Sequence, residues 1–228
     1  MKAGKNLPFL LDEAMKIKDC TLVIFDLDGT LVDAYPAITE SFNHVMRAFG
    51  YPARSPRVIR AAVGWGDRNL LAPFVRERDL PGILAAYRRH HSSCLRRKSR
   101  LLKGARRILG YLKKKDYKLG VASNRPARFS RILITHLKVA HFFDYVLCSD
   151  KIRHMKPHPE ILMRIMRRLK GDPRHTLFVG DMVIDAQAGS RAGVKTIIVT
   201  TGSSSTAHIR KSRPFAVIKN LAQLSSFV

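Results

Sequence analysis

The sequence predicts an α/β fold in which a doubly wound parallel sheet carries a small α-helical insertion. Short apolar runs alternate with segments of helical pattern along most of the 228 residues, which is typical of parallel sheets. The apolar runs are continuous, as expected for strands that are buried on both faces. One interval, from about residue 35 to residue 102, contains helical patterns and no convincing strand.

Five strands are predicted from β-rich apolar runs. In chain order the runs are "TLVIF", "KLGVAS", "YVLCS", "HTLFVGD" and "KTIIVTT", which cover residues 21–25, 118–123, 145–149, 175–181 and 195–201. Because these runs lack the alternation of a half-exposed strand, we place them in the middle of the sheet.

The predicted helices of the insertion carry their own end signals. Residues 36–50, "PAITESFNHVMRAFG", begin with Pro and end with Gly, and residues 83–95, "ILAAYRRHHSSCL", continue the helical pattern. The two glycines of residues 62–71, "AVGWGDRNLL", predict a loop. A short helix within residues 7–19 is expected to pack on the core.

These elements predict two structural units. Residues 1–34 and 103–228 would form the α/β core, and residues 35–102 would form the helical insertion.

Composition restricts the class of protein. The three cysteines are scattered without the paired spacing of a disulfide framework or a zinc site, which favours a reducing compartment. No apolar run approaches the roughly 20 residues of a membrane helix, and the N-terminal apolar run is too short for a signal peptide. We therefore expect a soluble cytoplasmic protein without membrane partners.

The formal net charge of +25 is the most unusual global property. A basic surface attracts nucleic acid or steers small anionic substrates, and a compositional bias would produce the same charge. The charge is densest in residues 88–115, which contain no acidic residue. Neither aromatic interleaving nor a nucleic-acid-binding module accompanies it, so a solvated basic face is the favoured interpretation.

Polar residues follow the predicted strands at points that would meet at one edge of the sheet. They are Asp26 and Asp28 after the first strand, Ser123 and Asn124 at the second, Lys156 after the third, and Asp181 and Asp185 after the fourth. Four carboxylates with one Lys leave excess negative charge, which a divalent cation would neutralise. Ligands that are all oxygen indicate Mg²⁺. A phosphate held beside a free carboxylate then favours phosphoryl transfer through an aspartyl-phosphate.

These motifs resemble those of the haloacid dehalogenase superfamily, and most closely its phosphoglycolate-phosphatase-like hydrolases with a helical cap. "DLDGTLVD", "VASN", "KPHPE" and "GDMVIDAQAG" match the four family motifs in order and cover nearly the whole chain. The resemblance implies a Rossmann-like core, a cap between the first two motifs, and Mg²⁺ as cofactor.

The resemblance also implies a role for each matching residue. Asp26 would be the nucleophile and Asp28 the general acid and base, with its backbone carbonyl on the metal. Ser123 would bind the phosphate, and Lys156 would offset negative charge. Asp181 would ligate the metal and Asp185 would hold the metal's waters or Lys156.

The resemblance further narrows the reaction and places substrate recognition. An acid at Asp28 favours phosphate esters over carbon–halogen cleavage, and a hinge without His favours hydrolysis over mutase action. Substrate identity would be determined by the cap, where Trp65 and Arg68 are candidate contacts, each balanced by packing or solvation as the alternative. Asn124 is a further candidate, although it could instead shape its loop. Arg125 is expected either in solvent or on a substrate anion.

Two functions of different class follow. The leading hypothesis is a Mg²⁺-dependent phosphatase of a small monoester such as phosphoglycolate, a sugar phosphate or a nucleotide. The alternative is a nucleic-acid-binding protein, or a nucleic-acid end phosphatase, that uses the basic surface.

Overall fold

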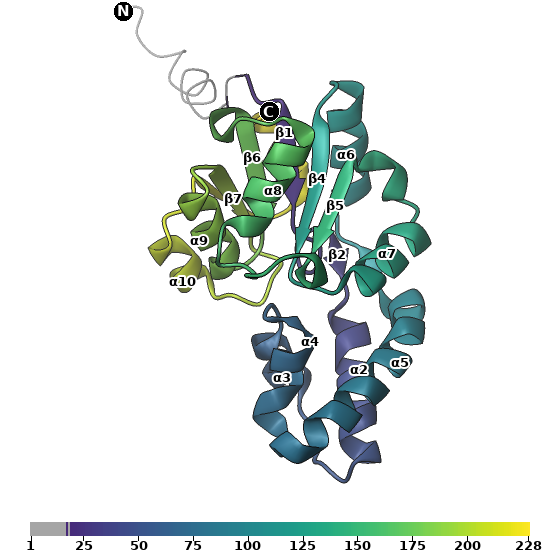
Figure 1. The fold of residues 1–228 in the computed structure, drawn as a ribbon. Coiled ribbons are helices and arrows are strands. Elements are labelled where there is room, and N and C mark those ends of the chain that lie inside the picture. The colour runs from purple at the N-terminus through teal and green to yellow at the C-terminus, as the bar shows by residue number, and fades with distance from the viewer. Residues whose placement is uncertain (1–16, 18) are drawn as a thin grey trace, which may run out of the picture.

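A six-stranded parallel sheet forms the centre of the protein (Figure 1). The structure is a computed structural model that describes Ile17 and residues 19–228. The strands lie in the order β5-β4-β1-β6-β7-β8. Their bounds are β1 Leu22–Phe25, β4 Lys118–Ser123, β5 Tyr145–Cys148, β6 Thr176–Gly180, β7 Lys195–Val199 and β8 Ala216–Ile218. The predicted α/β class is confirmed.

The helices of the core cover both faces of this sheet. Their bounds are α6 Ala105–Lys114, α7 Ala127–His136, α8 Glu160–Leu169, α9 Val183–Arg191 and α10 Thr206–Lys211. Alternate residues of β1 point to opposite faces: Val23 joins the cluster that contains α6 and α7, whereas Ile24 joins the cluster of α8 and α9. All four residues of β1 are fully buried, which explains why its sequence is continuously apolar.

Each of these helices packs through a stripe of apolar residues. In α8 the buried residues are Ile161, Leu162, Ile165 and Met166, at the spacing of one helical face. In α6 they are Ala105, Ile108, Leu109 and Leu112, and the basic residues of the last turn lie outside this stripe. The two stripes hold the sheet between helical layers.

The helices of the insertion gather below the sheet in Figure 1. Their bounds are α2 Tyr35–Ala48, α3 Pro56–Ala62, α4 Gly66–Leu71 and α5 Leu80–Lys98. Two short strands, β2 (Val32–Asp33) and β3 (Arg100–Leu101), pair antiparallel where the chain leaves and re-enters the core. Among the described residues, no helix has the length and apolar character needed to cross a bilayer.

The structure departs from the sequence-based expectations at three places. The sequence pattern misses strand β8 because its three residues give too short a run. Strand β3 lies inside the interval predicted to lack strands, where Arg100 pairs with Asp33 across the two legs of the insertion. Within residues 62–71 only residues 63–65 form a loop, since α3 ends at Ala62 and α4 begins at Gly66.

The helix predicted within residues 7–19 lies almost wholly outside the described residues.

Candidate active site

The first two acidic residues lie in the turn that follows β1. Because β1 is flanked by β4 and β6, Asp26 stands between Ser123, at the end of β4, and Asp181, which follows β6. The turn contains Gly29 with φ of +81°, and a Cβ there would come within 2.3 Å of the Asp181 carboxylate. The close approach of turn and carboxylate therefore requires glycine at this position.

Lys156 forms the centre of a buried ion-pair network. Its ammonium donates to Asp26 Oδ1 at 2.7 Å, to Asp185 Oδ1 at 2.8 Å and to the carbonyl of Ala122 at 2.9 Å. The side chain is only 2% exposed. Burial opposes its charge, but Asp185 and Asp26 outweigh burial and raise the pKa of Lys156. A charged lysine is thus locked against the carboxylate of Asp26.

The carboxylates that surround Lys156 remain short of positive charge. Burial, with the neighbouring Asp185 and Asp28, raises the pKa of Asp26 to about 6 although Lys156 opposes the shift. Burial, followed by Asp26 and Asp185, also raises the pKa of Asp181 well above its usual value. Both pKa values are raised because the carboxylates are buried away from water and lie close to other negative charges.

The geometry of the acidic residues fits a divalent cation. Carboxylate oxygens of Asp26, Asp181 and Asp185 lie within 4.8 Å of one another. Asp181 accepts a hydrogen bond from Thr30 at 2.9 Å through Oδ1, whereas its buried Oδ2 has no hydrogen-bond partner among the described residues. A buried carboxylate oxygen is costly without a partner. The all-oxygen donors, one of them unsatisfied, are those that suit Mg²⁺.

Both carboxylate oxygens of Asp185 already accept hydrogen bonds from the protein. Its Oδ2 accepts from the backbone N–H groups of Asp181 and Met182 at 3.1 and 2.9 Å, while its Oδ1 accepts from Lys156. It therefore fixes the loop after β6 and the lysine in place, and Asp181 offers the freer oxygen.

The structure places Arg125 differently from one of its two sequence-based expectations. Its guanidinium is buried and binds both oxygens of Asp28, at 2.7 Å from Nε and 2.8 Å from Nη2. Its Nη1 lies 2.8 Å from His91 Nε2 on helix α5. Arg125 is thus wedged between the core and the insertion, and the expectation of an arginine in solvent is wrong because two partners and burial hold it inside.

His91 completes this chain of contacts as a neutral ring. Burial and then the positive charge of Arg125 hold the pKa of His91 well below its ordinary value. Nε2 therefore accepts from Arg125, and Nδ1 carries the proton and donates to Ser41 Oγ at 3.0 Å. One sequence feature points to His91: it lies on the same face of α5 as the buried Ile83, Tyr87 and Cys94, where a polar side chain needs a partner.

Asn124 uses its side-chain amide to join three loops. Its Nδ2 donates to the carbonyls of Gly64 and Lys156 at 2.9 and 3.0 Å, and its Oδ1 accepts from the Lys156 N–H at 2.9 Å. The neighbouring Ser123 Oγ accepts from the Arg125 N–H at 3.2 Å. Asn124 thereby links the insertion to the loop that carries Lys156.

A cavity lies between the strand ends and the insertion. From the core it is lined by polar residues that include Asp26, Asp28, Ser123, Asn124, Arg125, Lys156 and Asp185. The insertion contributes mostly apolar lining, namely Ile38, Val63, Leu70 and Tyr87, together with Gly64, Gly66, Asp67 and His91.

Neither Trp65 nor Arg68 lines this cavity. Trp65 precedes α4 and is 43% exposed. The structure therefore does not bring these two predicted substrate contacts to the site. The glycines on either side of Trp65, both with positive φ, line the cavity instead.

Most of the chain matches a known protein family. A family model described as haloacid dehalogenase-like hydrolase matches residues 23–199. The chain belongs to this hydrolase family. The matched range includes every residue of the acidic cluster and of the ion-pair network.

Curated relatives and solved structures extend the comparison. The hydrolase is 30% identical over 216 residues to phosphoglycolate phosphatase of Pseudomonas putida, covering 89% of this chain and 78% of that protein. It is 31% identical over 185 residues to N-acetylmuramic acid 6-phosphate phosphatase of the same organism, covering 79% and 82%.

A crystal structure from Haemophilus somnus, described as a predicted phosphoglycolate phosphatase, superposes with a TM-score of 0.86 at 24% identity. It covers 91% of this chain and 97% of that one. At 24% sequence identity, this structural similarity is evidence for a shared fold alone.

Proposed function

We propose that this hydrolase is a Mg²⁺-dependent phosphatase that cleaves a small phosphate monoester through an aspartyl-phosphate on Asp26. The observation that carries the proposal is that Asp26, Asp28 and Lys156 line one cavity while the partnerless carboxylate oxygen of Asp181 belongs to the same acidic cluster as Asp26. Phosphoglycolate phosphatases and a sugar-phosphate phosphatase among the relatives support the class of substrate.

The proposed reaction uses two carboxylates in turn. An oxygen of Asp26 bonds to phosphorus while the bond to the leaving oxygen breaks, and Asp28 gives that oxygen its proton. Asp28 then takes a proton from water, whose oxygen attacks phosphorus and breaks the bond to Asp26. Lys156, 2.7 Å from Asp26, offsets the charge that accumulates there.

Asp26 and Asp181, with the backbone carbonyl of Asp28, would hold the Mg²⁺, and Asp185, whose oxygens accept from Lys156 and two backbone N–H groups, would hold the metal's waters. When bound, the ion would neutralise the clustered carboxylates and let a phosphate dianion approach them. Ser123 would donate a hydrogen bond to that phosphate, because its hydroxyl proton has no acceptor among the described residues while its oxygen accepts from the Arg125 N–H.

Arg125 links substrate binding to the proposed general acid. Both oxygens of Asp28 are occupied by Arg125, so Asp28 can approach a leaving oxygen only when the guanidinium moves. A second anionic group on the substrate, such as the carboxylate of phosphoglycolate, would draw Arg125 toward itself by a bidentate contact. This arrangement favours a substrate that carries an anion besides the phosphate.

The apolar residues that the insertion contributes to the cavity favour a small substrate over a polynucleotide. Residues 35–102 form a proposed cap, and their apolar side chains Val63, Leu70 and Tyr87 cover the polar residues of the core. The alternative, a nucleic-acid end phosphatase, rests on the net charge of +25 alone.

The test is phosphate release from a panel of esters, with and without Mg²⁺. The panel contains phosphoglycolate, N-acetylmuramic acid 6-phosphate, other sugar phosphates, nucleotides and a 3′-phosphorylated oligonucleotide. We expect Mg²⁺-dependent release from a small ester and little from the oligonucleotide. Release without metal, or from no ester at all, would contradict the proposal, and preference for the oligonucleotide would favour the alternative.

Replacing Arg125 with Ala should lower activity more on substrates that carry a second anionic group than on substrates whose only anion is the phosphate. We expect kcat/KM for phosphoglycolate to fall about 10- to 100-fold, the loss of a charge-assisted contact, and to fall less for an ester whose only anion is the phosphate. Steady-state kinetics on both esters gives the comparison. Arg128→Ala, an exposed arginine three residues further along in α7, is the matched control. Equal losses on both esters would show that Arg125 does not recognise the second anion.

Adding Mg²⁺ should stabilise the protein more at pH 7.5 than at pH 5. In the metal-free protein the raised pKa of Asp26, about 6, and that of Asp181 make the folded state the better proton binder. The stability from these groups is present below their unfolded pKa of 3.8. The contribution of Asp26 is lost as pH rises through about 6, and that of Asp181 is lost as pH rises through its own raised pKa. Mg²⁺ relieves the repulsion where the carboxylates are ionised.

Thermal unfolding at both pH values, with Mg²⁺ or with EDTA, measures this difference. We expect Asp181→Asn to remove most of the shift in Tm. An equal Tm with and without Mg²⁺ at pH 7.5 would count against the metal site.

A further inference from the structure

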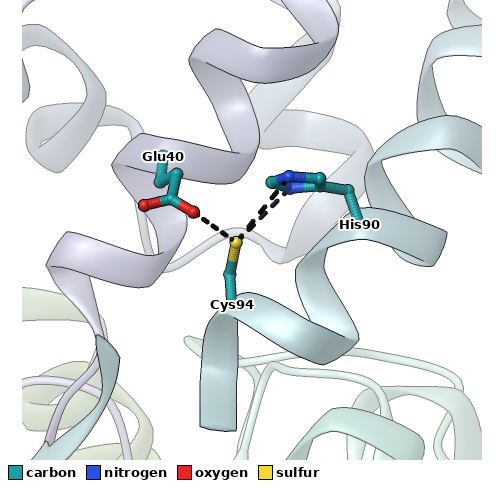
Figure 2. A group of neighbouring side chains, drawn as sticks. All are labelled: Glu40, His90 and Cys94. Atoms are coloured by element: carbon teal, nitrogen blue, oxygen red, sulfur yellow. Dashed lines mark hydrogen bonds between the residues drawn. The ribbon is translucent and has the colours of Figure 1, made fainter. Parts of the chain in front are cut away.

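A second group of metal-binding side chains lies outside the active site, on the two long helices of the insertion (Figure 2). Figure 2 shows Glu40 on α2 facing His90 and Cys94 on α5. His90 and Cys94 are four residues apart, so one helical turn places both on the same face. His44 occupies the corresponding position one turn after Glu40, and its ring stacks on that of His90 with a centroid distance of 3.8 Å.

The distances in this group are those of donors around a single ion. Cys94 Sγ lies 3.0 Å from Glu40 Oε1 and 3.4 Å from His90 Nδ1. One donor atom from each of the three residues lies within 4.8 Å of the other two. In a tetrahedral zinc site the bond lengths of Zn–S and Zn–N place neighbouring donors about 3.5 Å apart. The three side chains are therefore close enough to share one ion once the His90 ring rotates to aim a nitrogen lone pair at it.

The group is accessible and its donors have lone pairs available. His44 is exposed, His90 is half-buried and Cys94 lies beneath them. Burial and then the neighbouring His44 lower the pKa of His90, so its ring is neutral near pH 7. Hydrogen bonds from Lys98 and Cys94 lower the pKa of Glu40 to about 2, so its carboxylate is ionised. Burial raises the pKa of the Cys94 thiol, which is therefore the one donor that must lose a proton.

Two cations compete for this place. Arg97 Nη2 lies 2.7 Å from Glu40 Oε1 and 3.4 Å from Cys94 Sγ, and Lys98 Nζ lies 2.9 Å from Glu40 Oε2. Their side chains are 58% and 49% exposed, so both can turn into solvent when an ion takes their place.

We propose that Glu40, His90 and Cys94 form a zinc-binding site that ties α2 to α5, with the fourth position open to solvent. Thiolate and imidazole donors select Zn²⁺ over Mg²⁺, whereas the all-oxygen cluster of the active site does the opposite. Binding breaks the S–H bond of Cys94, forms a Zn–S bond and releases one proton to solvent, so affinity rises with pH.

The location gives this site a structural consequence. Glu40 lies in the second turn of α2, soon after the chain leaves the core, and Cys94 lies in the last turns of α5, shortly before the chain returns. A bound ion would therefore clamp the two legs of the insertion beside the pair of strands β2 and β3. This proposal does not depend on the phosphatase function.

The test is a titration of the EDTA-treated full chain with Co²⁺ in excess Mg²⁺, followed by Zn²⁺. We expect Co²⁺ to give a near-ultraviolet thiolate-to-metal absorption with a stoichiometry of one, and Zn²⁺ to remove it by displacement. A cobalt ion in the active site has no thiolate donor and gives no such band. Absence of the band in the native chain would overturn the proposal.

Variants identify the donors. Cys94→Ser should abolish the band, and His90→Ala should weaken or shift it, each with a native circular dichroism spectrum. Cys148→Ser, which removes another buried thiol, should leave the band unchanged. A band that survives Cys94→Ser, or that Cys148→Ser removes, would assign the metal elsewhere and contradict the proposal.

Thermal unfolding gives an independent measure. At Zn²⁺ about 100-fold above the dissociation constant we expect Tm to rise by about 5 °C or more in the native chain and not in Cys94→Ser. Equal shifts in both proteins would show that zinc acts at another place.

Discussion

Replacing Asp26 with Asn is expected to reduce phosphate release at least about 1,000-fold, because an amide oxygen does not form the covalent intermediate. The substitution preserves the shape of a side chain that is 8% exposed. It also removes one of the repelling charges around Asp181. Folding should therefore be retained while kcat collapses. Steady-state release of phosphate from the best ester of the panel measures the loss.

Asp116→Asn is the matched control for this loss. Asp116 is exposed in the turn between α6 and β4, at the opposite end of β4 from Ser123. It makes the same exchange of carboxylate for amide, and we expect unchanged activity. Activity of Asp26→Asn within about tenfold of the native enzyme would exclude Asp26 as the nucleophile.

Replacing Lys156 with Met should damage both catalysis and stability. The variant leaves Asp26 and Asp185 buried without their shared cation, and loss of one partner from a buried ion pair costs about 3 kcal/mol of unfolding free energy. We also expect kcat to fall about 100- to 1,000-fold because the negative charge near the transferring phosphoryl group is no longer offset. Urea unfolding and steady-state kinetics measure the two effects.

The stability loss should be smaller in saturating Mg²⁺ than in EDTA, since the metal ion replaces part of the missing charge. Lys151→Met, at an exposed lysine in the segment before Lys156, controls for the change of residue type and should have little effect. A Lys156→Met protein with native stability in EDTA would contradict the importance of this ion pair.

The central strands and the proposed catalytic core could be predicted because their causes are local. Continuous apolar runs are produced by burial on both faces, and the order of polar residues after them follows from the parallel topology. The structure accordingly gathers Asp26, Ser123, Lys156 and Asp181 at one edge of the sheet. Their individual roles remain predictions for the experiments above.

Elements that depend on partners distant in the chain could not be predicted. Strand β3 has two residues and exists only against β2. Helix α4 begins at Gly66, which a sequence pattern assigns to a loop, because the glycine conformation there turns the chain into the helix. Short elements of this kind carry too few residues for a periodic pattern.

The sequence by itself determined the α/β class, the helical character of most of residues 35–98 and the set of carboxylates that follow the strands. Only the tertiary structure decided that Arg125 binds Asp28 and His91. It also decided that Trp65 lies away from the cavity, and that Glu40 meets His90 and Cys94. The physical reason is the range of the interactions. Hydrophobic periodicity and the polar residues at strand ends can be recognised from residues that are neighbours in the chain. Ion pairs and metal-binding groups depend instead on which distant segments are brought together when the chain packs.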